Sequence, residues 1–458
     1  MPIPDRAQAG DFHFLAYSYP GDADAAPWDL SQPVPARGNY RFLSLRNALQ
    51  GLHGAAQENG VPNVSLSLPG EAIHDGGNTF CVMALSFGGG DDPQREVLIT
   101  GGVHAREWIA PTMAYLLAEY LIKHYAAEPE GQCQTAIHDL VNGTRIHFVP
   151  LLNPAGNWHS VFSLAGGARL WRKNRRRLPL TPDEWARALG LDLDAGTAAN
   201  PPLRNIAAGA DQVTYEAPLL PDRPGVRLRY DPLTIDLAPD KPQYIGVDVN
   251  RNFNTPFWGH ESGADEEGLP PDQAYFGPNR VSEAETRSLV GFLRAQAVDA
   301  AIDYHSYGQY IIYAGEGRTP QLAEVDNGRA LQSTISSRLN PRWWNGYDYS
   351  LGSVFGLLSY RASASVADYM AVEGNAIAFT IELSPSSSDG AGFQLPEDRI
   401  MATFEANIRG ALGFIAAADR SRLRVIEGGL FTRHGIAATP YATFAGWNVF
   451  GRGNRLPA

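Results

Sequence analysis

Apolar residues recur at two spacings along the chain, and the two spacings alternate. Helical spacing, with an apolar residue every three to four positions, occurs over 40–57, 110–125, 282–296, 330–339 and 399–418. Short apolar runs typical of strands lie over 80–87, 96–103, 145–152, 244–250, 300–307 and 376–383. Strands that alternate with helices indicate an α/β fold. We therefore expect a mixed, largely parallel twisted sheet of about eight strands with helices on both faces.

One region interrupts this alternation. Residues from about 175 to 242 are rich in Pro, Gly, Asp and Ala, and within them only 181–193 shows helical spacing. So long a connection with little regular structure is usually functional or mobile. We expect a main domain over 40–421 that carries this insertion, with an N-terminal extension over 1–39 and a C-terminal extension over 422–458.

Charge and composition narrow the class of partner. The 458 residues carry a formal net charge of -12. Nucleic-acid binding needs a surplus of Lys and Arg to neutralise phosphates, so we expect no nucleic-acid partner. No apolar run is long enough to span a membrane, and the first residues lack the apolar core of a signal peptide, so we expect a cytoplasmic chain without a membrane partner. We also expect a monomer.

Two histidines and a glutamate have the setting of metal ligands. His104 and Glu107 lie three residues apart, just past a strand-like run, and His305 stands near the end of the apolar run 300–307. The carboxyl ends of strands are where an α/β sheet places its ligand-binding groups. A catalytic zinc site needs three protein ligands of N and O type and one open position. The three residues are a candidate zinc site; a solvated surface pair at 104–107 and a structural histidine at 305 stay open as alternatives.

Other polar residues beside apolar runs suggest an active site around this metal. Asp248 can accept the second ring N–H of a ligand histidine, and Asn250 with Arg251 offers donors that suit a carboxylate. Arg172 is a candidate cation for a developing oxyanion. Glu382 is the one carboxylate in its apolar run, and burying it is costly unless it is paired or functional, which makes it the candidate base. A surface Arg in a turn, a solvated basic face and a Glu that reaches solvent are the ordinary alternatives.

Eight segments follow one another along the chain: HAREW, NPAGNWHS, RLWRKNR, GVDVNRNF, SEAETRSL, HSYGQYIIY, YRASASVADY and FTIEL. In this order they resemble the zinc metallocarboxypeptidases of the carboxypeptidase A and B group. Each segment is weak alone, but the ordered set is specific. The resemblance covers about 40–420, apart from the insertion.

The resemblance implies one Zn²⁺ per chain and a hydrolytic mechanism. It implies that His104, Glu107 and His305 are the zinc ligands. It implies that Glu382 is the general base and that Arg172 polarises the scissile carbonyl group.

The resemblance also implies how a peptide substrate is held. Asn250 and Arg251 would bind its terminal carboxylate, and Tyr360 would close over the bound end. Three residues would line the subsites before the cleaved bond, namely Arg106, Ser306 and Tyr307. Asp248 would support the zinc ligand His104 from behind.

Two residues give opposing indications about the preferred C-terminal residue. By resemblance, Ala367 forms the pocket floor, where A-type enzymes have an apolar residue and B-type enzymes an aspartate, so it favours an apolar end. Glu316 matches an acid in relatives that prefer basic ends, and a carboxylate there would pair with a terminal Arg or Lys. Its flanking glycines are equally typical of a mobile surface turn. The negative net charge tips our expectation towards a basic or mixed preference.

The first interpretation is a zinc-dependent exopeptidase that releases the C-terminal residue of peptides or proteins. A specialised cell-wall carboxypeptidase, acting on D-amino or γ-linked substrates, is a second interpretation within the same fold. A zinc amidohydrolase and a non-catalytic peptide binder are a third and a fourth.

Overall fold

The computed structural model describes the chain with gaps. The described residues are 14–16, 42–75, 78–91, 93, 95–130, 132–162, 168–176, 204–208, 213–216, 227–230, 246–256, 258, 273–277, 279–315, 320, 322–335 and 348–417. The predicted helix over 181–193, the C-terminal extension over 422–458 and Glu316 lie outside them, as does most of the N-terminal extension over 1–39.

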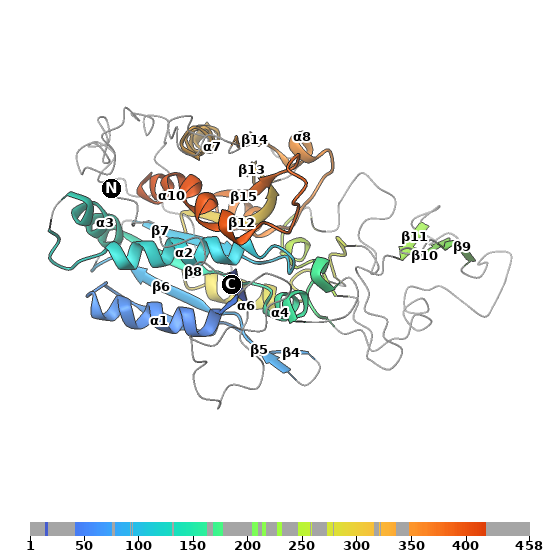
Figure 1. Ribbon diagram of the computed structural model, residues 1–458, viewed down its shortest axis with the longest axis horizontal. Coiled ribbons are helices and arrows are strands. Elements are labelled where there is room, and N and C mark those ends of the chain that lie inside the picture. The colour runs from blue at the N-terminus through green and yellow to red at the C-terminus, as the bar shows by residue number, and fades with distance from the viewer. Residues whose placement is uncertain are drawn as a thin grey trace.

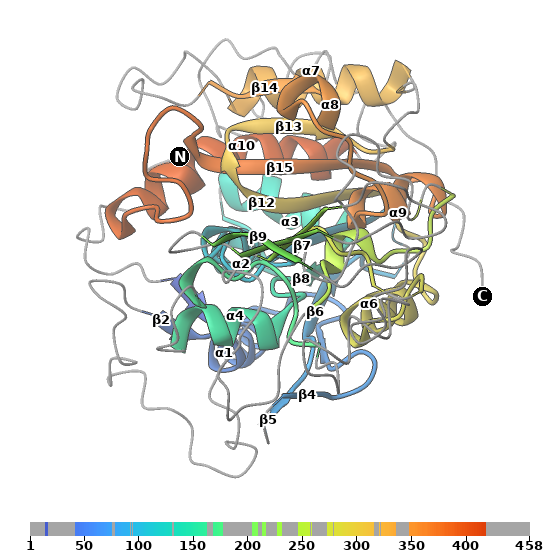
Figure 2. The same cartoon turned by 90° about the vertical axis from the view of Figure 1, so that its right-hand side faces the viewer.

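An eight-stranded mixed sheet forms the centre of the molecule (Figure 1). In spatial order its strands are β14 (Ser350–Gly352), β13 (Tyr310–Tyr313), β15 (Ile377–Ser386), β12 (Ala300–Gly308), β7 (Arg95–Gly101), β8 (Thr144–Val149), β6 (Ala84–Gly88) and β3 (Ser65–Ser67). Figure 2 shows this order from β14 near the top of the view to β6 below. Strands β15, β12, β7 and β8 are parallel, whereas β13 and β6 run antiparallel to their neighbours β15 and β8. The predicted mixed, largely parallel sheet is confirmed.

Helices cover both faces of this sheet. The helices are α1 (Leu45–Glu58), α2 (Ile109–His124), α3 (Gln132–Gly143), α4 (Pro154–Phe162), α6 (Ala284–Leu293), α7 (Leu322–Ile335), α8 (Val354–Leu358), α9 (Val366–Val372) and α10 (Ile400–Ala417), with short 3-10 turns η1 (Ala168–Leu170), η2 (Val249–Arg251) and η3 (Glu397–Arg399). Helix α2 packs on β7, β8 and β12, and α1, α3 and α10 lie beside it. On the other face, α9 packs on β12 and β15, and α6 joins the same apolar core.

The side chains of the central strands alternate between two apolar cores. Val97 and Ile99 of β7 lie in the core under α2, whereas Leu98 lies in the core under α6 and α9. On β12, Ile302 and Ala301 divide in the same way. Because both faces are covered, these strands read as continuous apolar runs, and their polar residues stand out as exceptions.

Three smaller sheets accompany the main one. Strands β1 (Phe14–Ala16) and β2 (Phe42–Ser44) form a parallel pair, and β4 (Ile73–Asp75) and β5 (Asn78–Phe80) an antiparallel pair. A three-stranded sheet contains β9 (Arg204–Ala208), β10 (Val213–Glu216) and β11 (Arg227–Tyr230). This last sheet falls inside the predicted insertion over 175–242, so part of that region has regular structure.

Two of the predicted strands differ from the structure. The run 80–87 is divided between the end of β5 and the start of β6. The run 244–250 was expected to be a strand, but its described part is an irregular segment followed by η2. Gly246 has φ +64°, and the Asp248 carboxylate accepts from the backbone N–H of Asn250, so the segment turns instead of extending. Within the described residues, no helix is long and apolar enough to cross a membrane.

Candidate metal centre and active site

The loop between β7 and α2 presents His104 and Glu107. Gly102, just after the strand, has φ +61°, a conformation that favours glycine. The loop is held at both ends of the motif, since the backbone N–H of Ala105 donates to the Arg172 carbonyl (2.9 Å) and that of Ala110 to the Glu107 carbonyl (3.1 Å). Two backbone hydrogen bonds therefore hold the loop that carries these two side chains.

Strand register brings His305 and Glu382 to the same place. β12 lies between β7 and β15, and all three are parallel, so their carboxyl ends lie on one edge of the sheet. Tyr304 is the register partner of Gly101, and His305 is the register partner of Glu382. This edge is where an α/β sheet places its ligand-binding groups.

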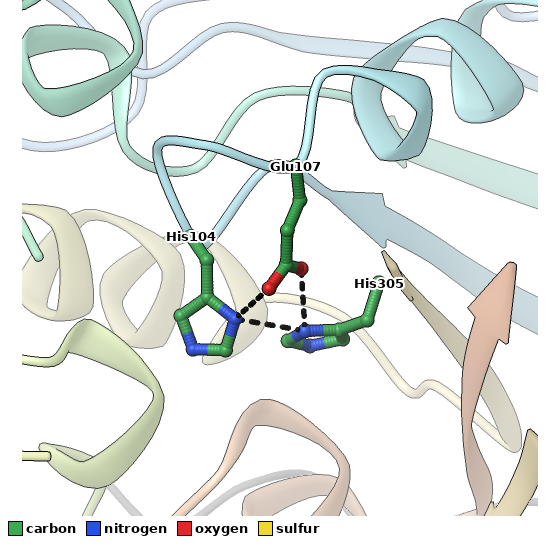
Figure 3. Close-up of side chains that lie close together, drawn as sticks. All are labelled: His104, Glu107 and His305. Carbon is green, nitrogen blue, oxygen red and sulfur yellow. Dashed lines mark hydrogen bonds and ion pairs between the residues drawn. The ribbon is translucent and has the colours of Figure 1, made fainter. Parts of the chain in front are cut away.

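Three side-chain donors converge at this edge (Figure 3). The Glu107 carboxylate lies between the two imidazoles, with one oxygen 2.8 Å from His104 Nδ1 and the other 3.1 Å from His305 Nδ1. The two Nδ1 atoms are 3.1 Å apart. All three residues are buried, and each offers a ligand atom within 4.8 Å of the others.

The donor set fits a zinc ion. Zinc binds imidazole nitrogen and carboxylate oxygen at about 2.0–2.2 Å in tetrahedral geometry, which places neighbouring ligand atoms roughly 3.3 Å apart. The observed separations are close to that value. Burial by itself would raise the pKa of Glu107, but contacts with His104 and His305 hold that pKa well below its usual range. Burial lowers the pKa of His104. Burial would also lower the pKa of His305, but the Asp303 and Glu107 carboxylates raise it well above its usual value, so His305 releases a proton when it binds a metal. An ionised carboxylate and a neutral imidazole are the forms that bind a metal.

Asp248 lies behind His104 and also contacts Arg172. Its Oδ1 is 3.3 Å from His104 Nε2. Its Oδ2 accepts from Arg172 Nε at 2.9 Å and lies 2.8 Å from a terminal nitrogen of the same guanidinium. Burial would raise the pKa of Asp248, but Arg172 and His104 hold it well below its usual range. One ionised carboxylate therefore positions a metal-ligand candidate and the candidate oxyanion cation together.

Asn250 and Arg251 occupy the turn η2, next to Asp248. The Asn250 Oδ1 atom accepts from the backbone N–H of Val366 at 3.0 Å, which fixes the orientation of the amide. Arg251 donates to the Asn250 carbonyl at 2.9 Å. Both side chains are buried yet line the cavity, so two preset donors face its interior.

A single cavity joins the metal-ligand candidates to a side pocket. It encloses about 490 Å³, its open mouth included. Its lining residues are His104, Arg172, Asn250, Arg251, His305, Ile312, Tyr313, Ala314, Val354, Leu358, Tyr360, Ala362, Ser365, Ala367, Asp368, Thr380 and Glu382. Tyr360 follows α8 and is 38% exposed at the rim, in contrast to the buried Ala367. One cavity is thus lined by predicted metal ligands, charged side chains and apolar residues together.

Glu382 is buried in this cavity. Among the described residues, its Oε2 atom has no hydrogen-bond partner. Burial, and then the charge of Glu107, raises the pKa of Glu382 to about 8. A carboxylate with a raised pKa and an uncommitted oxygen is suited to exchanging protons.

The other predicted subsite residues lie next to the cavity and not among its lining residues. The Arg106 guanidinium lies 4.1 Å from the centroid of the Phe393 ring, and Tyr307 packs edge-on against the same ring at 4.8 Å. Arg106 also donates to Gln273 at 2.9 Å. Ser306 contributes its backbone N–H to Glu107 at 3.1 Å.

Sequence reasoning missed three residues of this neighbourhood. Phe393 and Gln273 come close to the site only in the folded chain, and no local sequence pattern marks them. Asp303, whose carboxylate lies 2.8 Å from His305 Nε2, had one: an Asp two residues before a His on a strand lies on the same face. Glu316, the predicted acid of the pocket wall, lies outside the described residues.

Comparisons with known proteins agree with this geometry. A sequence profile of the zinc carboxypeptidase family matches residues 76–410. Carboxypeptidase A5 of Homo sapiens is 26% identical over 334 residues, which cover 71% of this chain and 58% of that protein. Carboxypeptidase B of Astacus astacus is 25% identical over 339 residues, covering 73% and 84%. The crystal structure of carboxypeptidase A from Helicoverpa armigera is similar in fold, with a TM-score of 0.55 and 22% identity over 82% of this chain and 74% of that one. The chain spans less than two thirds of the length of the first of these relatives.

Proposed function

Because the chain belongs to the zinc carboxypeptidase family, we propose that it is a zinc-dependent exopeptidase that releases the C-terminal residue of peptides or proteins. One observation carries the proposal. The same cavity is lined by two of the metal-ligand candidates, a buried carboxylate, a fixed arginine and a pair of carboxylate-binding donors. Each of these groups has a role in peptide hydrolysis at a free C-terminus, and that reaction uses all of them together.

His104, Glu107 and His305 would hold the metal. When bound, zinc supplies a Lewis acid and lowers the pKa of a water molecule from about 16 towards roughly 7. The chain's own contribution is a buried set of N and O donors with fixed directions, which leaves the cavity side open.

Glu382 would move the protons of the reaction. Its raised pKa and its uncommitted Oε2 suit a group that takes a proton from the attacking water and then gives one to the leaving amine. Arg172 would donate to the oxyanion that develops on the scissile carbonyl. Asp248 holds the Arg172 guanidinium through two close contacts, so that donor needs no reorganisation during the reaction.

Asn250 and Arg251 would bind the free carboxylate of the substrate. A guanidinium and an amide with preset directions recognise that group and not an amide or an internal peptide bond. Tyr360, at the exposed rim, would close over the bound end. The Arg106 and Tyr307 side chains, packed on Phe393, would contact the residues before the cleaved bond, with Ser306 beside them.

The described pocket lining favours an apolar or aromatic C-terminal residue. Ala314, Ala362 and Ala367 line it and leave space without charge. Asp368 also lines it, but its two oxygens accept from the backbone N–H groups of Gly315 and Ser365. A terminal Arg or Lys would require an uncommitted carboxylate, and the candidate for that is Glu316.

The comparisons do not favour a different activity. The matched family and the similar proteins are carboxypeptidases, so neither an amidohydrolase nor a cell-wall specialist finds support in them. A non-catalytic binder would not need a buried carboxylate beside the metal ligands. A cytoplasmic location and a monomeric state stay predictions.

Release of amino acids from blocked dipeptides tests the proposal. The substrates end in Phe, Leu, Arg, Lys or Glu, and each is paired with its C-terminal amide. We expect release from the free acids, preferentially from those with Phe and Leu ends, loss of release with a zinc chelator, and recovery when zinc is added back. No chelator-sensitive release from any of them would refute the proposed function.

A further inference from the structure

Asp303 is a buried carboxylate that the proposed mechanism does not use. It lies on β12 two residues before His305 and is 1% exposed. Side chains alternate along a strand, so Asp303 and His305 lie on the same face. An ionised carboxylate inside a covered sheet is costly unless its oxygens are matched by donors. The donors it contacts therefore indicate its role.

Both oxygens of Asp303 have a partner. Oδ1 accepts from the Thr100 hydroxyl at 2.7 Å, and Oδ2 lies 2.8 Å from His305 Nε2. Thr100 is 1% exposed and is the register partner of Asp303 on β7. Two neighbouring strands of the central sheet thus hold this carboxylate against the imidazole.

This arrangement determines which ring nitrogen of His305 carries a hydrogen. An ionised carboxylate only accepts hydrogen bonds, so Nε2 must donate to it. The neutral ring then has its lone pair on Nδ1, the atom that lies 3.1 Å from both Glu107 and His104 Nδ1. The ring is presented to the metal position in the form that binds a metal.

The contact of Asp303 with His305 is shorter and more exclusive than the contact of Asp248 with His104. Asp248 divides its oxygens among His104, the Arg172 guanidinium and the backbone N–H of Asn250, and its distance to His104 Nε2 is 3.3 Å. Asp303 serves one imidazole at 2.8 Å and one hydroxyl.

The same bond affects the substrate anchor. Asn250 Nδ2 lies 3.3 Å from His305 Nε2. Because Nε2 donates to Asp303, it does not accept from this amide, and the amide hydrogens stay available to a ligand in the cavity.

We propose that Asp303 is a positioning residue for the metal: held by Thr100, it fixes the tautomer and ring orientation of His305 and thereby raises zinc affinity. This inference rests on the proposed function in that His305 must be a zinc ligand. Asp303 is not among the residues that line the cavity, and its contact with the metal-ligand candidates is the one with His305.

The zinc dissociation constant of Asp303→Asn tests the inference. The amide keeps the shape but is a weaker acceptor, and it can offer an N–H to Nε2 and so favour the wrong tautomer. We expect zinc to bind about 10- to 100-fold more weakly in competition with a chromophoric chelator. Thr100→Val removes the hydroxyl that holds the carboxylate, and we expect a loss of about fivefold, as for one hydrogen bond.

Asp299→Asn is the matched control. Asp299 is equally buried, but it directly precedes β12, at the opposite end of that strand from His305, and its carboxylate accepts from the backbone N–H of Glu96 at 3.1 Å. We expect its zinc affinity to equal that of the unchanged protein, and urea unfolding of the zinc-free forms reports any general loss of stability. Unchanged zinc affinity in Asp303→Asn, or an equal loss in Asp299→Asn, would overturn the inference. If Asp303→Asn does not fold, unchanged affinity in Thr100→Val overturns it.

Failure of the proposed function is separable from failure of this inference. Zinc binding is measured without substrate. A protein that releases no amino acid but loses zinc affinity as expected in Asp303→Asn would refute the exopeptidase and support the positioning role. Chelator-sensitive release with unaltered affinity in the variant would do the reverse.

Discussion

Glu382→Gln should abolish most turnover while leaving the metal site intact. Glutamine keeps the shape of the side chain and a hydrogen-bond acceptor, but it cannot take a proton from water. We expect kcat to fall by at least about a hundredfold, within the usual range for a general acid–base group. The proposed zinc ligands are unchanged, so zinc binding should be retained.

The same substitution should stabilise the zinc-free protein at alkaline pH. Burial and the charge of Glu107 raise the pKa of Glu382 from 4.5 to about 8. The folded state therefore binds this proton more tightly than the unfolded state, and stability is lost as pH rises from 4.5 to about 8. The difference corresponds to at most about 5 kcal/mol. Glutamine carries no charge at any pH, so the variant escapes this loss.

Urea unfolding of chelator-treated protein at pH 5 and pH 9 measures this effect, and release from a Phe-ending dipeptide with zinc measures turnover. We expect similar stability of the two proteins at pH 5 and a more stable variant at pH 9. Near-normal turnover would show that another residue moves the proton. A variant less stable than the unchanged protein at pH 9 would contradict the electrostatic argument.

Three further substitutions address the anchor, a buried acid outside the site and the pocket wall. Arg251→Ala should raise KM by about 10- to 100-fold, because the substrate carboxylate loses one charged hydrogen-bond partner. Equal cleavage of free and amidated peptides by the unchanged protein would contradict this role of Arg251. Burial and the nearby Glu283 raise the pKa of Glu285 to about 7, so the free energy of unfolding falls as pH rises from 4.5 to 7. Glu285→Gln should therefore lose less of this free energy between pH 5 and pH 8 than the unchanged protein, as measured by urea unfolding. Glu316→Gln should leave the ratio of kcat/KM for Arg-ending over Phe-ending substrates unchanged. A fall in that ratio would instead support a preference for basic C-terminal residues.

The fold could be predicted where apolar spacing and burial agree. The spacing over 110–125 predicted α2 to within one residue at each end, and the run 300–307 became β12. The prediction of a strand over 244–250 was wrong for a physical reason. A buried apolar segment satisfies the strand pattern whether or not a neighbouring strand pairs with it, and here Asn174 takes that place, since its Oδ1 accepts from the backbone N–H of Val247 at 2.7 Å.

The candidate site also contains a part that could be predicted from the sequence and a part that could not. His104, Glu107 and His305 could be proposed because each stands at the end of an apolar run, and the sheet brings all three together. Contacts that depend on strand register or on distant loops could not be predicted from the sequence. Thr100 meets Asp303 only because β7 and β12 are paired in one particular register, and no local pattern encodes that pairing.

Asp248 explains why the separate motifs behave as one site. Its Oδ1 contacts His104 Nε2 and also accepts from the backbone N–H of Asn250, while its Oδ2 binds the Arg172 guanidinium. Three groups with different proposed roles, at the metal, at the substrate carboxylate and at the oxyanion, are therefore fixed relative to a single buried anion. A displacement of that anion would misplace all three at once. We therefore expect their contributions to be non-additive, because all three groups contact the same carboxylate.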